Sequence, residues 1–360
     1  MFKNLRNNYY FGKAGKADFT VDDLPATRLQ LFRETLRTRL GTLTRVNILY
    51  ALSFIPLLVV LVIFLGNIWN VVINSDLGDG TSLYGLTLQQ EQTEEAAKTL
   101  ADYKPVDATL ARDAIHYYLF RMLLWIIPCI ALTGPFTAGV SYLVRNWSRD
   151  EHAFAWTDFK DALKDNWKQA LPVSLITGMV PFFVYLGVTT YHDMAVNNML
   201  FIIPEAIVII AGIMWSLAVT YMYPLMVTYE LKFKDLMRNA FLLAVARLPW
   251  SVGIRLLHCV PVVLAVGVVF LFPSVAHFAI LFLIVWYALL GLMLSRFVTA
   301  SYCNAVFDRF INPRIQGAKV NQGLRKEDDD DEEEESAEEK KEEPRELEKV
   351  ISETEKRVEE

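Results

Sequence analysis

Apolar positions gather in six long runs, and polar, charge-rich segments separate them. The first run, Val46–Trp69, has 24 residues and no charge. A bilayer core of ~30 Å needs roughly 20 mostly apolar residues as a helix, so such runs predict membrane-spanning helices. The other runs are 117–144, 170–190, 199–226, 255–272 and 276–295. The last two are short and meet at a tight turn at Pro273, so they either span separately or form one buried hairpin.

The polar segments before the first, third and fifth runs share a motif. Each contains Phe, a basic residue and an acidic residue in succession, beginning at Phe32, Phe159 and Phe233. Around each Phe, apolar residues recur every three or four positions, which is typical of an amphipathic helix lying at the membrane interface. We favour duplication over chance. The predicted fold class is an all-α polytopic membrane protein, with about six transmembrane helices as three hairpins, each preceded by an amphipathic interfacial helix.

Basic residues indicate the orientation. Lys and Arg number nine in residues 1–45, five in 145–169 and four in 229–251, but three in the long segment 70–116. Cytoplasmic segments carry the excess of Lys and Arg, so both chain ends are expected in the cytoplasm. The predicted parts are a cytoplasmic N-terminal segment with an amphipathic helix (1–45), a six-span membrane domain (46–311) with an external loop (70–116), and an acidic, disordered cytoplasmic tail (312–360).

The tail and the external loop have their own signals. The net charge of −6 conceals a tail, 326–360, with 19 acidic and 7 basic residues. Its unbroken acidic run repels itself, which predicts a disordered, solvating end.

In the external loop, Thr87–Gln90 resembles a capping box for a helix that continues through Tyr103. Asp76–Asp79 favours a solvated turn over a calcium loop, because the regular ligand order is missing.

Reactive chemistry has no signature in the chain. The five histidines are scattered, and no nucleophile elbow, phosphate-binding glycine loop or metalloprotease helix is present. We therefore expect no enzyme activity, no catalytic or metal-binding residues, no cofactor and no nucleic-acid partner.

Two charges lie inside predicted spans. A charge at the bilayer centre costs roughly 2.5–3.5 kcal/mol on insertion scales, so such residues usually have a partner. Arg121 and Glu205 each lie about 8–9 Å from the outer end of their span at a rise of about 1.5 Å per residue. We predict that they pair across the bundle, and the alternative is that both side chains reach the headgroup layer.

The segment Leu132–Val140, continuing to Arg145, and the later pairs Phe159-Lys160 and Trp167-Lys168 resemble the YesL-like family, a bacterial membrane domain of unknown function numbered 624. That family has Thr-Gly-Pro-x-x-x-Gly at the end of its second span. The resemblance covers most of Leu31–Phe310, and the chain departs from it in its large external loop and acidic tail. Gly134 and Gly139 permit close helix approach, and Pro135 frees a carbonyl, so this motif serves either packing or contact with a small molecule.

The resemblance implies a place in the cell but no reaction. Members are commonly encoded beside carbohydrate ABC-importer and two-component genes of Gram-positive bacteria. It therefore implies a protein of the bacterial plasma membrane that acts as an accessory or sensory partner of carbohydrate uptake. Basic cytoplasmic helices would be its docking surfaces, and ABC-importer or two-component membrane proteins its partners. The alternative is a small-solute transporter built on three hairpin repeats. The family supplies no catalytic residues, and the oligomeric state is not predicted.

Overall fold

A computed structural model of the protein describes residues 24–91 and 93–325. The chain divides into two compact units. The described part of the smaller unit is 24–37, 149–151 and 305–325, and the larger unit comprises 38–148 and 152–304. Residues 1–23 and 326–360 lie outside the described residues. Residues 312–325, predicted to belong to the disordered tail, are described, include the short helix η5 (Asn312–Arg314) and belong to the smaller unit.

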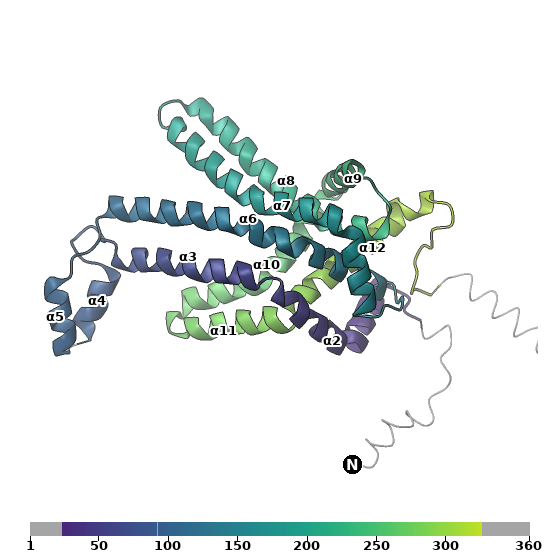
Figure 1. The fold of residues 1–360 in the computed structure, drawn as a ribbon, viewed down its shortest axis with the longest axis horizontal. Coiled ribbons are helices and arrows are strands. Elements are labelled where there is room, and N and C mark those ends of the chain that lie inside the picture. The colour runs from purple at the N-terminus through teal and green to yellow at the C-terminus, as the bar shows by residue number, and fades with distance from the viewer. Residues whose placement is uncertain (1–23, 92, 326–360) are drawn as a thin grey trace, which may run out of the picture. The chain divides into compact units, whose positions relative to one another are not determined.

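The regular structure of the described residues is helical, and six of the helices are long and apolar enough to cross a membrane. This confirms the all-α, six-span fold class, and the protein is a polytopic membrane protein. The six candidate spans are α3 (Ile55–Asn74), α6 (Ala108–Trp147), α7 (Thr157–Ala195), η2 (Met199–Phe201) with α8 (Ile202–Thr228), α10 (Leu248–Leu271), and α11 (Ala276–Trp286) with η4 (Tyr287–Gly291) and α12 (Leu292–Phe310). Figure 1 shows α6 and α7 side by side, and they form the most extensive helix pair of the larger unit.

The α10–α11 hairpin exposes large apolar side chains along its length. Leu264, Phe270 and Phe278 are 63%, 85% and 63% exposed. In a bilayer these side chains contact lipid, so the protein does not bury this hairpin. The two-span interpretation is favoured over a buried hairpin.

The first span begins later than predicted. The amphipathic helix α2 (Arg28–Leu52) continues past Val46, breaks at Ser53 and Phe54, and is followed by α3. Pro56 stands at the start of α3, where its missing N–H is tolerated, and it cannot continue the ladder of the preceding helix. The predicted boundaries Val46–Trp69 are therefore corrected to Ile55–Asn74.

The three amphipathic segments are not equivalent. The segment around Phe159 forms the first turns of α7, which runs on into the span without a break. The segment at Phe233 is a separate short helix, α9 (Phe233–Ala246), and one residue separates it from α10. Pro249 stands at the start of α10, where it favours a helix boundary, whereas no proline lies in the first turns of α7. The predicted interfacial helix before the third span is thus not an independent element.

The external loop contains two short helices, α4 (Leu83–Gln90) and α5 (Glu94–Asp102). The hydroxyl of Ser82 caps α4 by accepting from Gly85 N at 3.0 Å, and that of Thr93 caps α5. The predicted helix start at Thr87 is wrong, because Ser82, more than one turn earlier, already provides the cap.

The turn before α4 is built on its own aspartates. Asp76 Oδ1 accepts from the backbone N–H groups of Gly78 and Gly80, both at 2.9 Å. Both glycines have positive φ, which this tight turn requires. Hydrogen bonds from Thr81, its hydroxyl first and its N–H second, hold the pKa of Asp79 below the ordinary value. The described geometry is that of a solvated turn.

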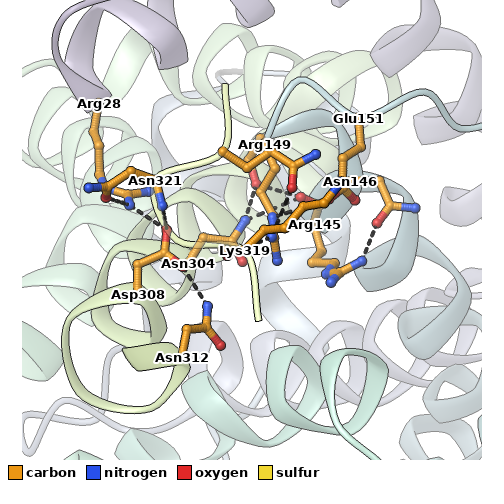
Figure 2. A network of polar contacts seen from close by, with 12 residues as sticks. Arg28, Arg145, Asn146, Arg149, Glu151, Asn304, Asp308, Asn312, Lys319 and Asn321 are labelled. Atoms are coloured by element: carbon orange, nitrogen blue, oxygen red, sulfur yellow. Dashed lines mark hydrogen bonds and ion pairs between the residues drawn. The ribbon is translucent and has the colours of Figure 1, made fainter. Parts of the chain in front are cut away.

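Within the smaller unit, the buried carboxylate of Asp308 joins segments far apart in sequence (Figure 2). It accepts from the Arg28 guanidinium and the Asn312 amide, both at 2.5 Å, and from Asn321 N at 3.2 Å. In the same unit, Arg149 donates to Lys319 O at 3.3 Å. The start of α2 and the segment after α12 are therefore one folded part of the chain.

A buried asparagine supports the π-helical turn η4. Such a turn departs from the regular α-helical hydrogen-bond ladder. The Asn47 amide donates to the carbonyls of Tyr287 and Ala288 at 2.9 and 2.7 Å, and Met293 N donates back to Asn47 Oδ1 at 2.8 Å. Asn47 is fully buried, so its amide satisfies backbone groups that lipid cannot.

Candidate functional site

The Gly-Pro motif lies at a very close approach of α6 and α7. A Cβ atom added at Gly134 would lie 2.1 Å from Ser174 Oγ and 2.6 Å from the backbone oxygen of Ala170. Only a glycine permits this backbone approach. Further along α6, a Cβ at Gly139 would meet the ring of Phe159 at 2.8 Å. Of the two roles predicted for the motif, the geometry favours helix packing.

The carbonyl that Pro135 frees has a partner on the facing helix. Proline lacks the N–H that would bond to the carbonyl four residues earlier, which is that of Ala131. The Ser174 hydroxyl lies 2.8 Å from Ala131 O and supplies the missing donor. In α8, Pro224 likewise frees the carbonyl of Thr220, and the Cys303 thiol lies 3.6 Å from that oxygen. At both prolines, therefore, a side chain from a neighbouring helix satisfies the freed carbonyl.

The two intramembrane charges have partners other than each other. Arg121 donates to the hydroxyl of Tyr117, one turn earlier on α6, at 2.7 Å, and its guanidinium also lies over that ring. Glu205 Oε1 lies 3.6 Å from Nδ1 of His192 near the end of α7. The structure does not bring Arg121 and Glu205 together. Arg121 is exposed, as the alternative of a side chain reaching the headgroup layer requires.

A cavity of about 800 Å³ opens beside the first turns of α7. Its lining comes from the end of α6, the start of α7, the end of α8 and the linker to α9. Gln169 holds that linker against α7 by donating to Leu231 O at 2.7 Å. The cavity thus has walls from three helices, and its shape depends on a specific side-chain contact.

The lining of this cavity is acidic. It includes Asp158, Asp161, Asp165 and Glu230, with Lys232 as its basic residue. The three aspartates recur at intervals of three and four residues, so they lie on one face of α7. Within the described part of the chain, Asp161, Asp165 and Glu230 form no ion pair. The lining therefore has more carboxylates than basic side chains, and this excess of negative charge suits a cationic partner.

A second cavity, of about 560 Å³, lies at the opposite end of the α6–α7 hairpin. It is lined by both signs of charge, including Arg112, Asp113 and Asp193. In its lining, His116 Nδ1 and the Tyr185 hydroxyl are 2.7 Å apart. Among the described residues, no group of three or more His, Cys, Asp or Glu side chains is placed to hold a metal ion.

The fold and these sites define a polytopic helical membrane protein whose central feature is the α6–α7 hairpin. Residues 116–188 match the family described as "Protein of unknown function, DUF624". This match confirms the family resemblance over residues 116–188, which include most of the hairpin with Gly134, Pro135, Gly139 and part of the acid-lined cavity. No curated protein and no solved structure matches the chain.

Sequence reasoning missed the acid-lined cavity. The apolar stripe and the lysines dominate the pattern of this amphipathic segment, where Lys160, Lys164 and Lys168 recur every four residues. The aspartates follow a parallel spacing on another face of the same helix. The spacing of the aspartates could have indicated an acidic face on this helix. The position of Glu230, on the α8–α9 linker, could not be predicted, because it depends on tertiary packing.

Proposed function

We propose that the protein is a non-enzymatic accessory or sensory partner of a carbohydrate uptake system in the bacterial plasma membrane. The acid-lined cavity is where it receives a basic segment of its partner, an ABC-importer or two-component membrane protein. The observation that carries the proposal is the concentration of carboxylates around a cavity of about 800 Å³. The link to carbohydrate uptake rests on the family resemblance.

Orientation is part of the proposal. Both chain ends lie in the cytoplasm, as the basic segments before α3, α7 and α10 favour. The start of α7 and the α8–α9 linker are then cytoplasmic, so the cavity faces the side on which a juxtamembrane basic segment is found. The docking surface differs from the one expected from sequence, since acidic rather than basic side chains line it.

The alternative of a small-solute transporter has less support from the packing. A path along the α6–α7 hairpin would have to connect the cavities at its two ends. Between them, Gly134 lies directly against the backbone of Ala170 and the side chain of Ser174. The carbonyl freed by Pro135 is also occupied at this point, because the Ser174 hydroxyl donates to it.

Co-purification from native membranes tests the proposal. The full chain and the double variant Asp161→Asn/Asp165→Asn are isolated under the same mild detergent. Wild type is expected to retain an importer or sensor-kinase component, and the variant to lose most of it. Asp113→Asn/Asp193→Asn, in the cavity at the other hairpin end, is the matched control and should retain the partner. Equal retention by all three proteins, or solute flux by the isolated protein in liposomes, would overturn the proposal.

A further inference from the structure

Two arginines delimit the longest uncharged stretch of the chain. Between Arg255 and Arg296 there is no Asp, Glu, Lys or Arg. The segments between them, from α10 to the start of α12, fold back at η3 (Pro273–Val275), and α10 packs along α11. Both arginines therefore lie at the same end of this hairpin, opposite its turn. His258 stands one turn beyond Arg255 on α10.

The three side chains converge on α8 and α12 of the larger unit. Arg255 donates through Nη2 to the backbone oxygen of Ser216 on α8. The Arg296 guanidinium lies 5.5 Å from the ring centroid of Tyr223, also on α8. His258 Nε2 is 3.4 Å from the Thr299 hydroxyl. His258 lies one turn from Arg255 on α10, and Thr299, which His258 contacts, lies one turn from Arg296 on α12. The three side chains are therefore neighbours, and we call Arg255, His258 and Arg296 the basic cluster.

The positive charge of the two arginines in the basic cluster is not balanced by the described part of the protein. Among those residues, no carboxylate lies within ion-pair distance of Arg255 or Arg296. Arg255 Nε is enclosed and has no hydrogen-bond partner there. Like charges repel strongly at half-buried positions, where water screens them poorly. An anion bound at the basic cluster would reduce that repulsion and would give Arg255 Nε an acceptor.

We propose that the basic cluster binds the phosphate group of an anionic phospholipid. Guanidinium groups match phosphate oxygens in a bidentate fork, which a lone ammonium cannot do. The side chains beside the cluster favour a lipid as the source of the phosphate. Leu256, Leu257 and Val260 are 63%, 51% and 43% exposed, and they offer an apolar surface to acyl chains. Basic pockets between transmembrane helices near a membrane surface bind lipid headgroups in this way.

Lipid retention measures this site directly. Full-length protein is reconstituted in nanodiscs of equal parts phosphatidylglycerol and phosphatidylcholine, extracted in mild detergent, and its retained lipid quantified by mass spectrometry. Wild type is expected to retain phosphatidylglycerol selectively. Arg255→Gln/Arg296→Gln should lower that retention about tenfold or more, the scale of losing charge-assisted hydrogen bonds. Arg121→Gln removes a single arginine that also lies over a tyrosine ring, and it should retain the lipid as wild type does.

Further arms separate the outcomes. Millimolar inorganic phosphate is not expected to displace the lipid, and displacement would show a soluble phosphate site and overturn the lipid assignment. Should the double variant aggregate, Arg255→Lys and Arg296→Lys are measured singly, since each keeps the charge and loses the fork. Reduced retention in these variants supports the proposal. Equal retention of both lipids by wild type, or unchanged retention in every folded variant, overturns it.

Discussion

Substitution of Gly134 by alanine tests whether the α6–α7 contact stabilises the fold. The new Cβ would lie 2.1 Å from Ser174 Oγ and 2.6 Å from Ala170 O, whereas ordinary contacts begin at 3.4 Å. Rotation of Ser174 relieves the first contact only, because the second involves backbone. The helices must therefore also separate by about 0.8 Å, as the Ala170 contact requires.

The expected cost follows from these contacts. Overpacking a close contact costs about 1–3 kcal/mol. Displacing the Ser174 hydroxyl leaves the Ala131 carbonyl unpaired, for about 1–3 kcal/mol more. Alanine regains about 1 kcal/mol of helix propensity. We expect a net loss of about 3 kcal/mol of unfolding free energy for Gly134→Ala.

Gly267→Ala is the matched control. Gly267 lies within α10, and a Cβ there would meet nothing within 4 Å. This variant gains the same helix propensity without a clash, so its stability should equal or exceed that of wild type. Both purified variants are heated in the same detergent. The temperature at which each loses its monodisperse peak reports its unfolding, and these two temperatures are compared. If Gly134→Ala unfolds at the same point as Gly267→Ala, close packing at this position does not stabilise the hairpin.

Three further outcomes are expected. Asn47→Ala should lower the unfolding free energy by about 3 kcal/mol, because it leaves several buried backbone groups at η4 without hydrogen-bond partners. A melting point within error of wild type would contradict that role. Ser174→Ala should lose about 1–2 kcal/mol by the same assay, less than Gly134→Ala, since it removes the donor without a clash. Thr81→Val should raise the pKa of Asp79. In wild type, the ionised Asp79 carboxylate stabilises the turn above its ordinary pKa, and this stability is lost as pH falls through the lowered pKa of the folded protein. In a carboxyl NMR titration, the midpoint for Asp79 should therefore lie at higher pH in the variant than in wild type.

Much of the architecture could be predicted because lipid imposes simple rules. Length and apolarity identify a spanning helix without knowledge of its neighbours, and all six spans were found in this way. The packing role of Gly134 and Gly139 was also visible, since small residues in a span permit close approach. The helix break at Ser53 and Phe54, just before Pro56, was less visible, because the apolar run crosses it without interruption.

The partners of individual side chains were harder to predict from the sequence than the membrane spans. The pairing of Arg121 with Glu205 assumed that equal depth implies proximity, but contact also depends on the rotation of each helix about its axis. Local geometry provides nearer partners: Tyr117 stands one helical turn from Arg121, and His192 lies near the end of α7, the helix before Glu205. Asn47 was likewise overlooked, since a single polar residue hardly changes the apolarity of its run.

The cross-helix donors at the prolines have a consequence for how such a chain varies. The carbonyl that Pro135 frees is paired with the side chain at position 174, and the one that Pro224 frees is paired with the side chain at position 303. Loss of the donor alone leaves a carbonyl exposed to hydrocarbon, whereas loss of the proline restores the helix's own bond and releases the partner position. These two pairs are therefore expected to change together among related chains, with the proline lost before its partner. Reconstructed ancestors of the hairpin would reveal that order of events.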